Sequence, residues 1–231
     1  QISLRDEIEQ TQDKRVKEAL LLAFSPGLDK FGARHDRQAP RVPRTAVRDH
    51  FLERVADWVV FWKAFEGKNW AEVEHADARW LPWKPHSSSC LITSPPYPGV
   101  LDYGQIQARR LRWIGDCSTS DWVRKTEIGR RGMASTWTEG MQFALRQAVR
   151  TLRPNSPMYL VVGDGVSQKT ALRVDEIIED LIADLPATLV AVASQERPHF
   201  HRPTAHLFAK RARLEHLILL RRTSGDIPRD R

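Results

Sequence analysis

The chain has 231 residues, of which 41% are hydrophobic and 28% charged, a composition typical of a soluble globular protein. No stretch approaches the roughly 18 consecutive apolar residues of a membrane span. Cys90 and Cys117 are too few for a disulfide framework or a cysteine metal cluster, so a reduced, cytoplasmic setting is expected. The net charge of +7 is compatible with a polyanionic partner, although many arginine-rich soluble proteins carry a similar charge.

The amino-terminal part of the chain is predicted to be helical. Residues 3–24 have an amphipathic pattern that ends before Ser25-Pro26-Gly27, and a second helix is expected from Thr45, a favoured N-cap residue, to Glu66. The second helix carries apolar residues at helical spacing, and a stripe of this kind is expected to belong to a hydrophobic core. The stripe consists of Val47, Phe51, Val55, Trp58, Val59, Trp62 and Phe65.

From Trp70 onward the pattern changes to alternating strands and helices. Strands are predicted at residues 71–77, 90–93, 158–162, 187–193 and 216–220. Helices are predicted at residues 101–116, 138–152 and 175–185. This alternation predicts an α/β layered fold with a mostly parallel sheet.

The most informative stretch is Ser94-Pro95-Pro96-Tyr97, which directly follows the strand predicted at residues 90–93. Proline fixes φ and has no N–H, so this turn can neither continue a sheet nor start a helix cleanly. It presents backbone carbonyls and one hydroxyl beside an aromatic ring, groups that can hold a flat base by its amino group. The alternative is a polyproline-type docking turn, but such turns usually lie in polar, flexible segments.

Thr93-Ser94-Pro95-Pro96-Tyr97 resembles the catalytic motif of the amino-methylating DNA methyltransferases, which use S-adenosylmethionine to methylate N4 of cytosine or N6 of adenine. The resemblance covers residues 70–222 and includes Ala76-Asp77-Ala78-Arg79, Leu152-Arg-Pro154 and Gly163-Asp164-Gly165. It implies a Rossmann-like methyltransferase sheet, complete or incomplete. Residues 1–69 would form a helical segment, an insertion or DNA-binding region, and residues 223–231 a flexible tail. A serine in the first motif position is more typical of the cytosine-N4 group, which favours N4 of cytosine over N6 of adenine.

The resemblance also implies roles for individual residues. Ser94, Pro95, Pro96 and Tyr97 would be catalytic: the Ser94 hydroxyl and the Pro95 carbonyl would draw the amine out of the plane of the base, and Tyr97 would stack on a base extruded from the duplex. S-adenosylmethionine is the expected cofactor, and no metal is expected. The residues expected to bind the cofactor are Asp77, Ala78, Thr93, Gly163 and Asp164.

DNA is the expected partner, and arginines near the motif and in two later loops are candidates to contact it. Arg109 and Arg112 lie one turn apart on the predicted helix, so they can face one groove; a solvated helix face is the alternative. The full set is Arg109, Arg110, Arg112, Arg130, Arg131, Arg197 and Arg202.

One element of the family is missing from the sequence: the Gly-rich turn of the type Asp-Pro-Phe-x-Gly-x-Gly, whose glycines let the backbone approach the cofactor. Val162-Gly163-Asp164-Gly165 is the one strand followed by glycines, and its place in the order favours a later strand over a permuted cofactor loop. An upstream segment or a second polypeptide would then supply the loop, and the chain alone would bind the cofactor poorly. The alternatives are an N6-adenine, RNA or protein methyltransferase, or a non-catalytic DNA-binding subunit of a restriction or defence system in a prokaryotic cell.

Overall fold

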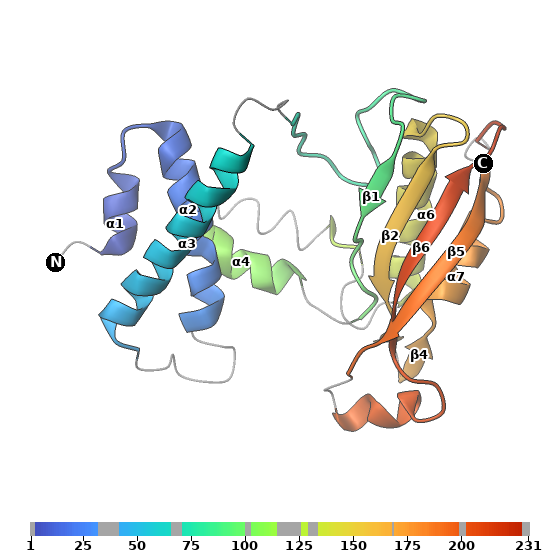
Figure 1. The fold of residues 1–231 in the computed structure, drawn as a ribbon. Coiled ribbons are helices and arrows are strands. Elements are labelled where there is room, and N and C mark those ends of the chain that lie inside the picture. The colour runs from blue at the N-terminus through green and yellow to red at the C-terminus, as the bar shows by residue number, and fades with distance from the viewer. Residues whose placement is uncertain are drawn as a thin grey trace. The chain divides into compact units, whose positions relative to one another are not determined.

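The computed structural model describes residues 3–31, 42–65, 71–99, 103–114, 126–128, 134–167, 169–198 and 202–227. The chain divides into two compact units, shown as a ribbon in Figure 1. One unit contains residues 1–72 and 105–122, and the other contains residues 73–104 and 123–231. Among the described residues, none of the helices is both long enough and apolar enough to cross a membrane.

The first unit is helical, as predicted, but its first helix is divided. Helix α1 spans Leu4–Glu9 and helix α2 spans Lys14–Phe31. The division is marked by a new helix start, where the Asp13 carboxylate accepts the N–H groups of Arg15 and Val16 at the beginning of α2. A capping box of Ser3 and Asp6 begins α1. The expected end of the helix at Pro26 is wrong, because α2 continues through this proline to Phe31.

Helix α3 spans Arg44–Ala64, and α4 spans Tyr103–Ile114. Phe51 of α3 is buried with Ile8 and Ala23 in a small core. The expectation that the whole aromatic stripe is core is wrong. Its carboxyl-terminal half is exposed, because successive apolar residues point to all sides of the helix while a neighbouring helix covers one side. The exposed residues of the stripe are Val59, Trp62 and Phe65, and their neighbours Val60 and Phe61 are exposed as well.

The second unit is built on a four-stranded sheet with the strand order β1-β2-β6-β5. These strands are Leu91–Thr93, Pro157–Gly163, Leu214–Arg222 and Ala187–Glu196, respectively. The α/β class is confirmed, but the expectation of a mostly parallel sheet is wrong. Only β1 and β2 pair in parallel; β6 pairs antiparallel with both β2 and β5. In its described part, the connection from β5 to β6 contains the 3-10 helix η1, Arg202–Phe208, in place of the α-helical crossover that usually joins parallel neighbours.

Two helices, α6 (Ala134–Thr151) and α7 (Val174–Ile182), lie on one face of this sheet (Figure 1). Side chains alternate along the strands, so Leu160 and Ile218 are buried under these helices while Leu217 is exposed on the other face. β1 is the edge strand, and its central residue, Ile92, is 76% exposed.

Two local features differ from the sequence predictions. Strands β3 (Gly165–Ser167) and β4 (Thr170–Leu172) form a hairpin that the sequence pattern did not predict. The strand expected at residues 71–77 is absent from the described structure, where Val73 is 87% exposed. Alternation alone does not make a strand, because the backbone needs a partner for its hydrogen bonds.

Candidate active site

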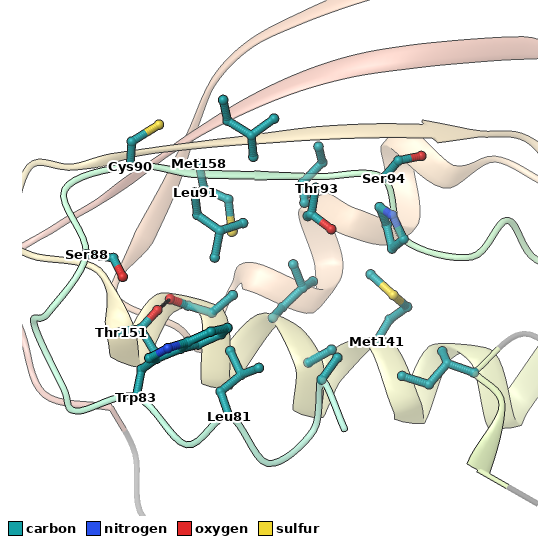
Figure 2. A pocket seen from close by; sticks show the side chains of 18 of the residues that line it. Leu81, Trp83, Ser88, Cys90, Leu91, Thr93, Ser94, Met141, Thr151 and Met158 are labelled. Carbon is teal, nitrogen blue, oxygen red and sulfur yellow. Dashed lines mark hydrogen bonds between the residues drawn. The ribbon is translucent and has the colours of Figure 1, made fainter. Parts of the chain in front are cut away.

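The Ser-Pro-Pro-Tyr loop leaves the carboxyl end of β1 and borders a cavity of about 550 Å³ between β1 and α6. Figure 2 shows Thr93 and Ser94 at one end of this cavity and Ser88 and Trp83 at the other. Leu91, Met141 and Met158 contribute to its largely apolar wall. Ser94 is therefore an exposed residue at the border of an apolar hollow large enough for a small molecule.

The backbone carbonyls of the loop differ in what they contact. The Pro96 carbonyl accepts a hydrogen bond of 2.7 Å from Nε1 of Trp137, a fully buried residue of α6. Within the described part of the chain, neither the Ser94 hydroxyl nor the Pro95 carbonyl has a hydrogen-bond partner. Both acceptors that the sequence assigns to the target amine are therefore open in the described structure.

The loop lies directly against the segment that follows β2, and glycines permit this close approach. A Cβ atom at Gly165 would overlap the Pro98 carbonyl, and one at Gly99, whose φ is +66°, would overlap the Val166 carbonyl. A Cβ at Gly163 would lie 3.0 Å from Cε2 of Tyr97. These glycines therefore allow Tyr97, Pro98 and Gly99 to pack against β2 and β3. In a cofactor loop, glycines would instead let the backbone approach the cofactor.

Tyr97 points away from the cavity beside Ser94. Its hydroxyl donates a hydrogen bond of 2.8 Å to Oε1 of Glu215, at the start of β6. The ring lines a second hollow of about 390 Å³ together with Arg197 and Arg213. Ser94 and Tyr97, expected to act on one base, thus line different hollows on the two sides of the loop.

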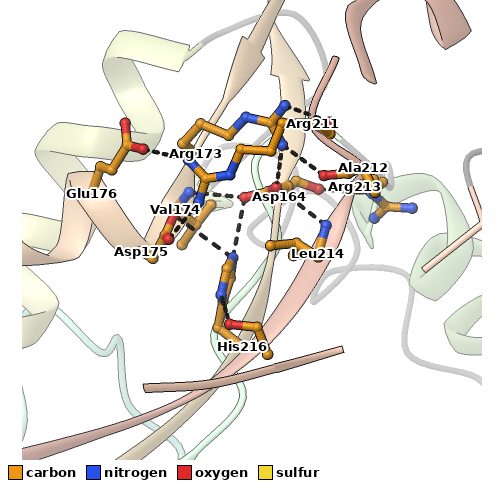
Figure 3. Close-up of polar contacts among 11 residues, drawn as sticks. Asp164, Arg173, Val174, Asp175, Glu176, Arg211, Ala212, Arg213, Leu214 and His216 are labelled. Atoms are coloured by element: carbon orange, nitrogen blue, oxygen red, sulfur yellow. Dashed lines mark hydrogen bonds and ion pairs between the residues drawn. The ribbon is translucent and has the colours of Figure 1, made fainter. Parts of the chain in front are cut away.

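Asp164 is fully buried, and four donors surround its carboxylate (Figure 3). The N–H groups of Val174 and Leu214, the Arg173 guanidinium and the His216 ring lie 2.7–3.3 Å from its oxygens. Burial alone would raise the pKa of Asp164, but these hydrogen bonds together hold the pKa below its usual value. The carboxylate joins β2, the start of α7 and β6, and these contacts favour a structural role. Its assignment to cofactor binding, with that of Gly163, stays a prediction.

Asp164, Asp175 and His216 form a group in which one ligand atom from each residue could reach a common metal ion. Each carboxylate, however, already pairs with an arginine: Asp164 with Arg173 and Asp175 with Arg211. His216 is fully buried, with Nε2 near Asp164 and Nδ1 2.9 Å from the Ser194 hydroxyl. Oδ1 of Asp175 is buried without a hydrogen-bond partner among the described residues and lies 3.8 Å from Nε2 of His216. The expectation that the protein binds no metal therefore stays a prediction.

The remaining residues predicted to bind the cofactor lie close to the cavity of Ser94. Ala78 and Thr93 line this cavity. Asp77 accepts hydrogen bonds of 2.9 and 2.6 Å from the Arg79 guanidinium, which holds the pKa of Asp77 below its usual value. Arg79 also donates to the Thr126 carbonyl, so the pair fixes the segment before the motif. No contact tests a cofactor role for these three residues, which stays a prediction.

The arginines predicted to contact DNA are only partly described. Arg130 and Arg131 lie outside the described residues, and the side chains of Arg109, Arg112 and Arg202 are not described. Arg110 has an interaction partner within the protein. Arg197 pairs with Glu215, so its charge is balanced by a carboxylate. Contact of these arginines with DNA stays a prediction.

Sequence reasoning missed two residues that support the loop, Trp137 and Glu215. Trp137 lies just before residue 138, where the predicted helix begins, so the sequence pattern did not place it on the buried face of α6. Glu215 is an acidic residue near the start of a strand, and nothing in a local pattern links it to a tyrosine 118 residues away. A buried tryptophan at helical spacing from Met141 and Leu145 is the one signal that could have identified the first.

Comparisons with known proteins gave structural neighbours only, since no family model and no curated protein matches the chain. A provisionally assigned DNA modification methylase from Thermus thermophilus is 18% identical, with a TM-score of 0.41 over 67% of this chain and 55% of that chain. The same protein, crystallised with S-adenosyl-L-methionine, gives 17% identity and a TM-score of 0.41 over 67% and 56%. A SAM-dependent methyltransferase from Methanosarcina mazei is 10% identical, with a TM-score of 0.40 over 74% and 77%. The chain thus spans about half the length of the first of these proteins.

Proposed function

We propose that this chain carries the acceptor half of an S-adenosylmethionine-dependent methyltransferase that modifies an exocyclic amino group of a DNA base, with N4 of cytosine as the favoured target. The observation that carries this proposal is the pair of open acceptors, the Ser94 hydroxyl and the Pro95 carbonyl, on a loop whose next carbonyl is held by Trp137. The Ser-Pro-Pro-Tyr sequence at the end of β1 supports the same reading.

The chemistry requires such a pair. The lone pair of a cytosine amino group is delocalised into the ring, so the planar amine is a poor nucleophile. Two acceptors that bind its two N–H groups out of the ring plane direct the lone pair toward an electrophile. Holding the amine in line with that electrophile supplies much of the remaining rate. In the proposed reaction, S-adenosylmethionine supplies the electrophilic methyl group.

The described residues do not by themselves form the cradle for this cofactor. Gly163 and Gly165 follow a strand, but the space beside them is filled by Tyr97 and Pro98. Among the described residues, no strand pairs with one edge of β1, and the cavity of about 550 Å³ lies beside β1. We therefore propose that the Gly-rich cofactor loop comes from a segment upstream of Gln1 or from a second polypeptide, and that it completes the site on this side of β1.

Transfer of labelled methyl groups tests the substrate class. The natural gene product, with any polypeptide that co-purifies with it, is incubated with methyl-labelled S-adenosylmethionine and a mixture of unmethylated DNA and RNA. We expect label in DNA, recovered as N4-methylcytosine after digestion to nucleosides. Label in N6-methyladenine would move the target to adenine, label in RNA or protein would contradict the DNA assignment, and no label would favour a non-catalytic subunit.

Calorimetry tests the location of the cofactor loop. We expect the 231-residue chain to bind S-adenosylmethionine weakly, and the chain with its upstream segment or partner polypeptide to bind it at least tenfold more tightly, roughly 1.4 kcal/mol. Equal affinity in both preparations would show that this chain holds the cofactor by itself.

A further inference from the structure

Tyr97 is held by contacts on two sides. Its ring lies over Gly163 at the end of β2, where a Cβ atom would approach the ring to 3.0 Å. Its hydroxyl donates to Oε1 of Glu215 at 2.8 Å. The first contact limits the depth of the ring and the second limits its direction, so β2 and β6 both constrain the ring.

Glu215 is itself anchored. Its second oxygen, Oε2, accepts hydrogen bonds from Nε2 of Gln195 at 3.0 Å and Nε of Arg197 at 2.9 Å, both from the end of β5 and the residue after it. The hydrogen bond from Arg197 is the largest influence that holds the pKa of Glu215 below its usual value, although partial burial opposes it. An ionised carboxylate only accepts hydrogen bonds, so Tyr97 must be the donor.

We propose that Glu215 is a positioning residue that sets the orientation of the Tyr97 ring, and that Gln195 and Arg197 hold Glu215 in place for this purpose. This inference rests on the proposed function and on the stacking of an extruded base on Tyr97 that the sequence predicts. Under this proposal, Arg197 holds Glu215 in place and does not contact a DNA phosphate, the role predicted from the sequence. The hydrogen bond to Glu215 also explains why Tyr97 is a tyrosine, because phenylalanine would fill the same space without a donor for Glu215.

The orientation of Tyr97 can be measured without any reaction. The chain has only 3 tyrosines, so NMR of protein labelled with ring-¹³C tyrosine gives few signals, and Tyr97→Phe identifies that of Tyr97. In Glu215→Ala the Tyr97 signal is expected to shift toward the position of free tyrosine, whereas Glu215→Gln keeps an acceptor oxygen and should retain most of the native shift. Glu196→Ala, an exposed glutamate at the end of β5, is the matched control and should leave the signal unchanged.

Kinetics separate positioning from a general loss of structure. Misplacement of a reacting group by about 1 Å reduces rates by up to about 10²-fold, so Glu215→Ala should lower kcat by roughly 10- to 10²-fold with little change in cofactor affinity. Glu215→Gln should restore most of the rate. Tyr97→Phe combined with Glu215→Ala should be no slower than the slower single variant, because both substitutions remove the same contact.

The outcomes are distinguishable. An unchanged Tyr97 signal in Glu215→Ala, or additive rate losses in the double variant, would overturn the role of Glu215. If the wild-type protein transfers no methyl group, the proposed function fails, and the NMR comparison still decides whether Glu215 orients Tyr97.

Discussion

The carboxyl end of β1 and its free edge differ in how many contacts the described structure gives them. At its carboxyl end, the loop from Ser94 to Gly99 is held by Trp137 of α6, by the glycines around β3 and by Glu215 of β6. Along its free edge, β1 has no strand partner among the described residues. On one face of β1, Ile92 is exposed, and the neighbouring cavity is largely apolar. Parallel strands are usually covered on both faces. Under the proposed function, the supported loop would present the acceptors to the base, and the uncovered part of β1 would receive the cofactor loop.

Trp137→Ala should have the largest effect on stability. The substitution removes a fully buried side chain and the donor to the Pro96 carbonyl, and truncations of this size cost about 3–5 kcal/mol. Urea denaturation measures the loss. Trp80→Ala, at a tryptophan that is 67% exposed in the same unit, is the control and should change stability by about 0.5 kcal/mol or less. Similar losses for both variants would contradict the view that Trp137 anchors the loop.

Asp164→Asn should destabilise the unit by about 1.5–3 kcal/mol, the usual worth of hydrogen bonds to a charged group. Because the pKa of Asp164 is lowered in the folded state from an ordinary value of 3.8, its stabilising contribution is present above that pH and is lost as the pH falls through the folded-state pKa. The free-energy difference between wild type and variant should therefore shrink at acidic pH. Asp180→Asn, at an exposed position of α7, serves as the control, and a difference that is constant with pH would exclude an ionised Asp164.

Gly165→Ala should cost about 1–3 kcal/mol and displace the loop, because the new methyl group would overlap the backbone of Pro98 and backbone cannot move aside freely. Thermal unfolding reports the cost, and hydrogen exchange of the loop amides reports the displacement. Gly27→Ala, in helix α2 with no neighbour closer than 3.8 Å, should be neutral or stabilising. An unperturbed loop in Gly165→Ala would show that the glycine is not needed for the close approach.

Ile92→Ala should have the smallest effect, about 0.5 kcal/mol or less, since this side chain is 76% exposed. Leu160→Ala, on the adjacent strand but buried, should cost about 2–5 kcal/mol. Chemical denaturation of both variants measures this contrast. A large loss for Ile92→Ala in the isolated chain would mean that this face of β1 is already covered.

Local sequence patterns predicted the helices, most strands and the motif, because hydrophobic spacing and proline constraints act over a few residues. They could not predict that β6 inserts between β2 and β5, since the antiparallel pairing of β2 with β6 depends on contacts between strands more than 50 residues apart. The same limit applies to the site. Ser94 and Pro95 were identified from the motif, whereas Glu215 and Trp137 support the loop from distant segments. Residues 163–165 illustrate the problem, because the sequence could not show that Tyr97 and Pro98 pack closely against these glycines.

The rate of methyl transfer to DNA in Ser94→Ala tests the central claim most directly. The natural gene product, with any co-purifying polypeptide, is compared with Ser94→Ala and with Ser89→Ala, an exposed serine before β1. Loss of one preorganised hydrogen bond to the reacting group should reduce kcat on the order of 10²-fold in Ser94→Ala, with cofactor affinity unchanged and Ser89→Ala fully active. Equal rates in all three proteins would contradict the assignment of Ser94 as an acceptor for the target amine.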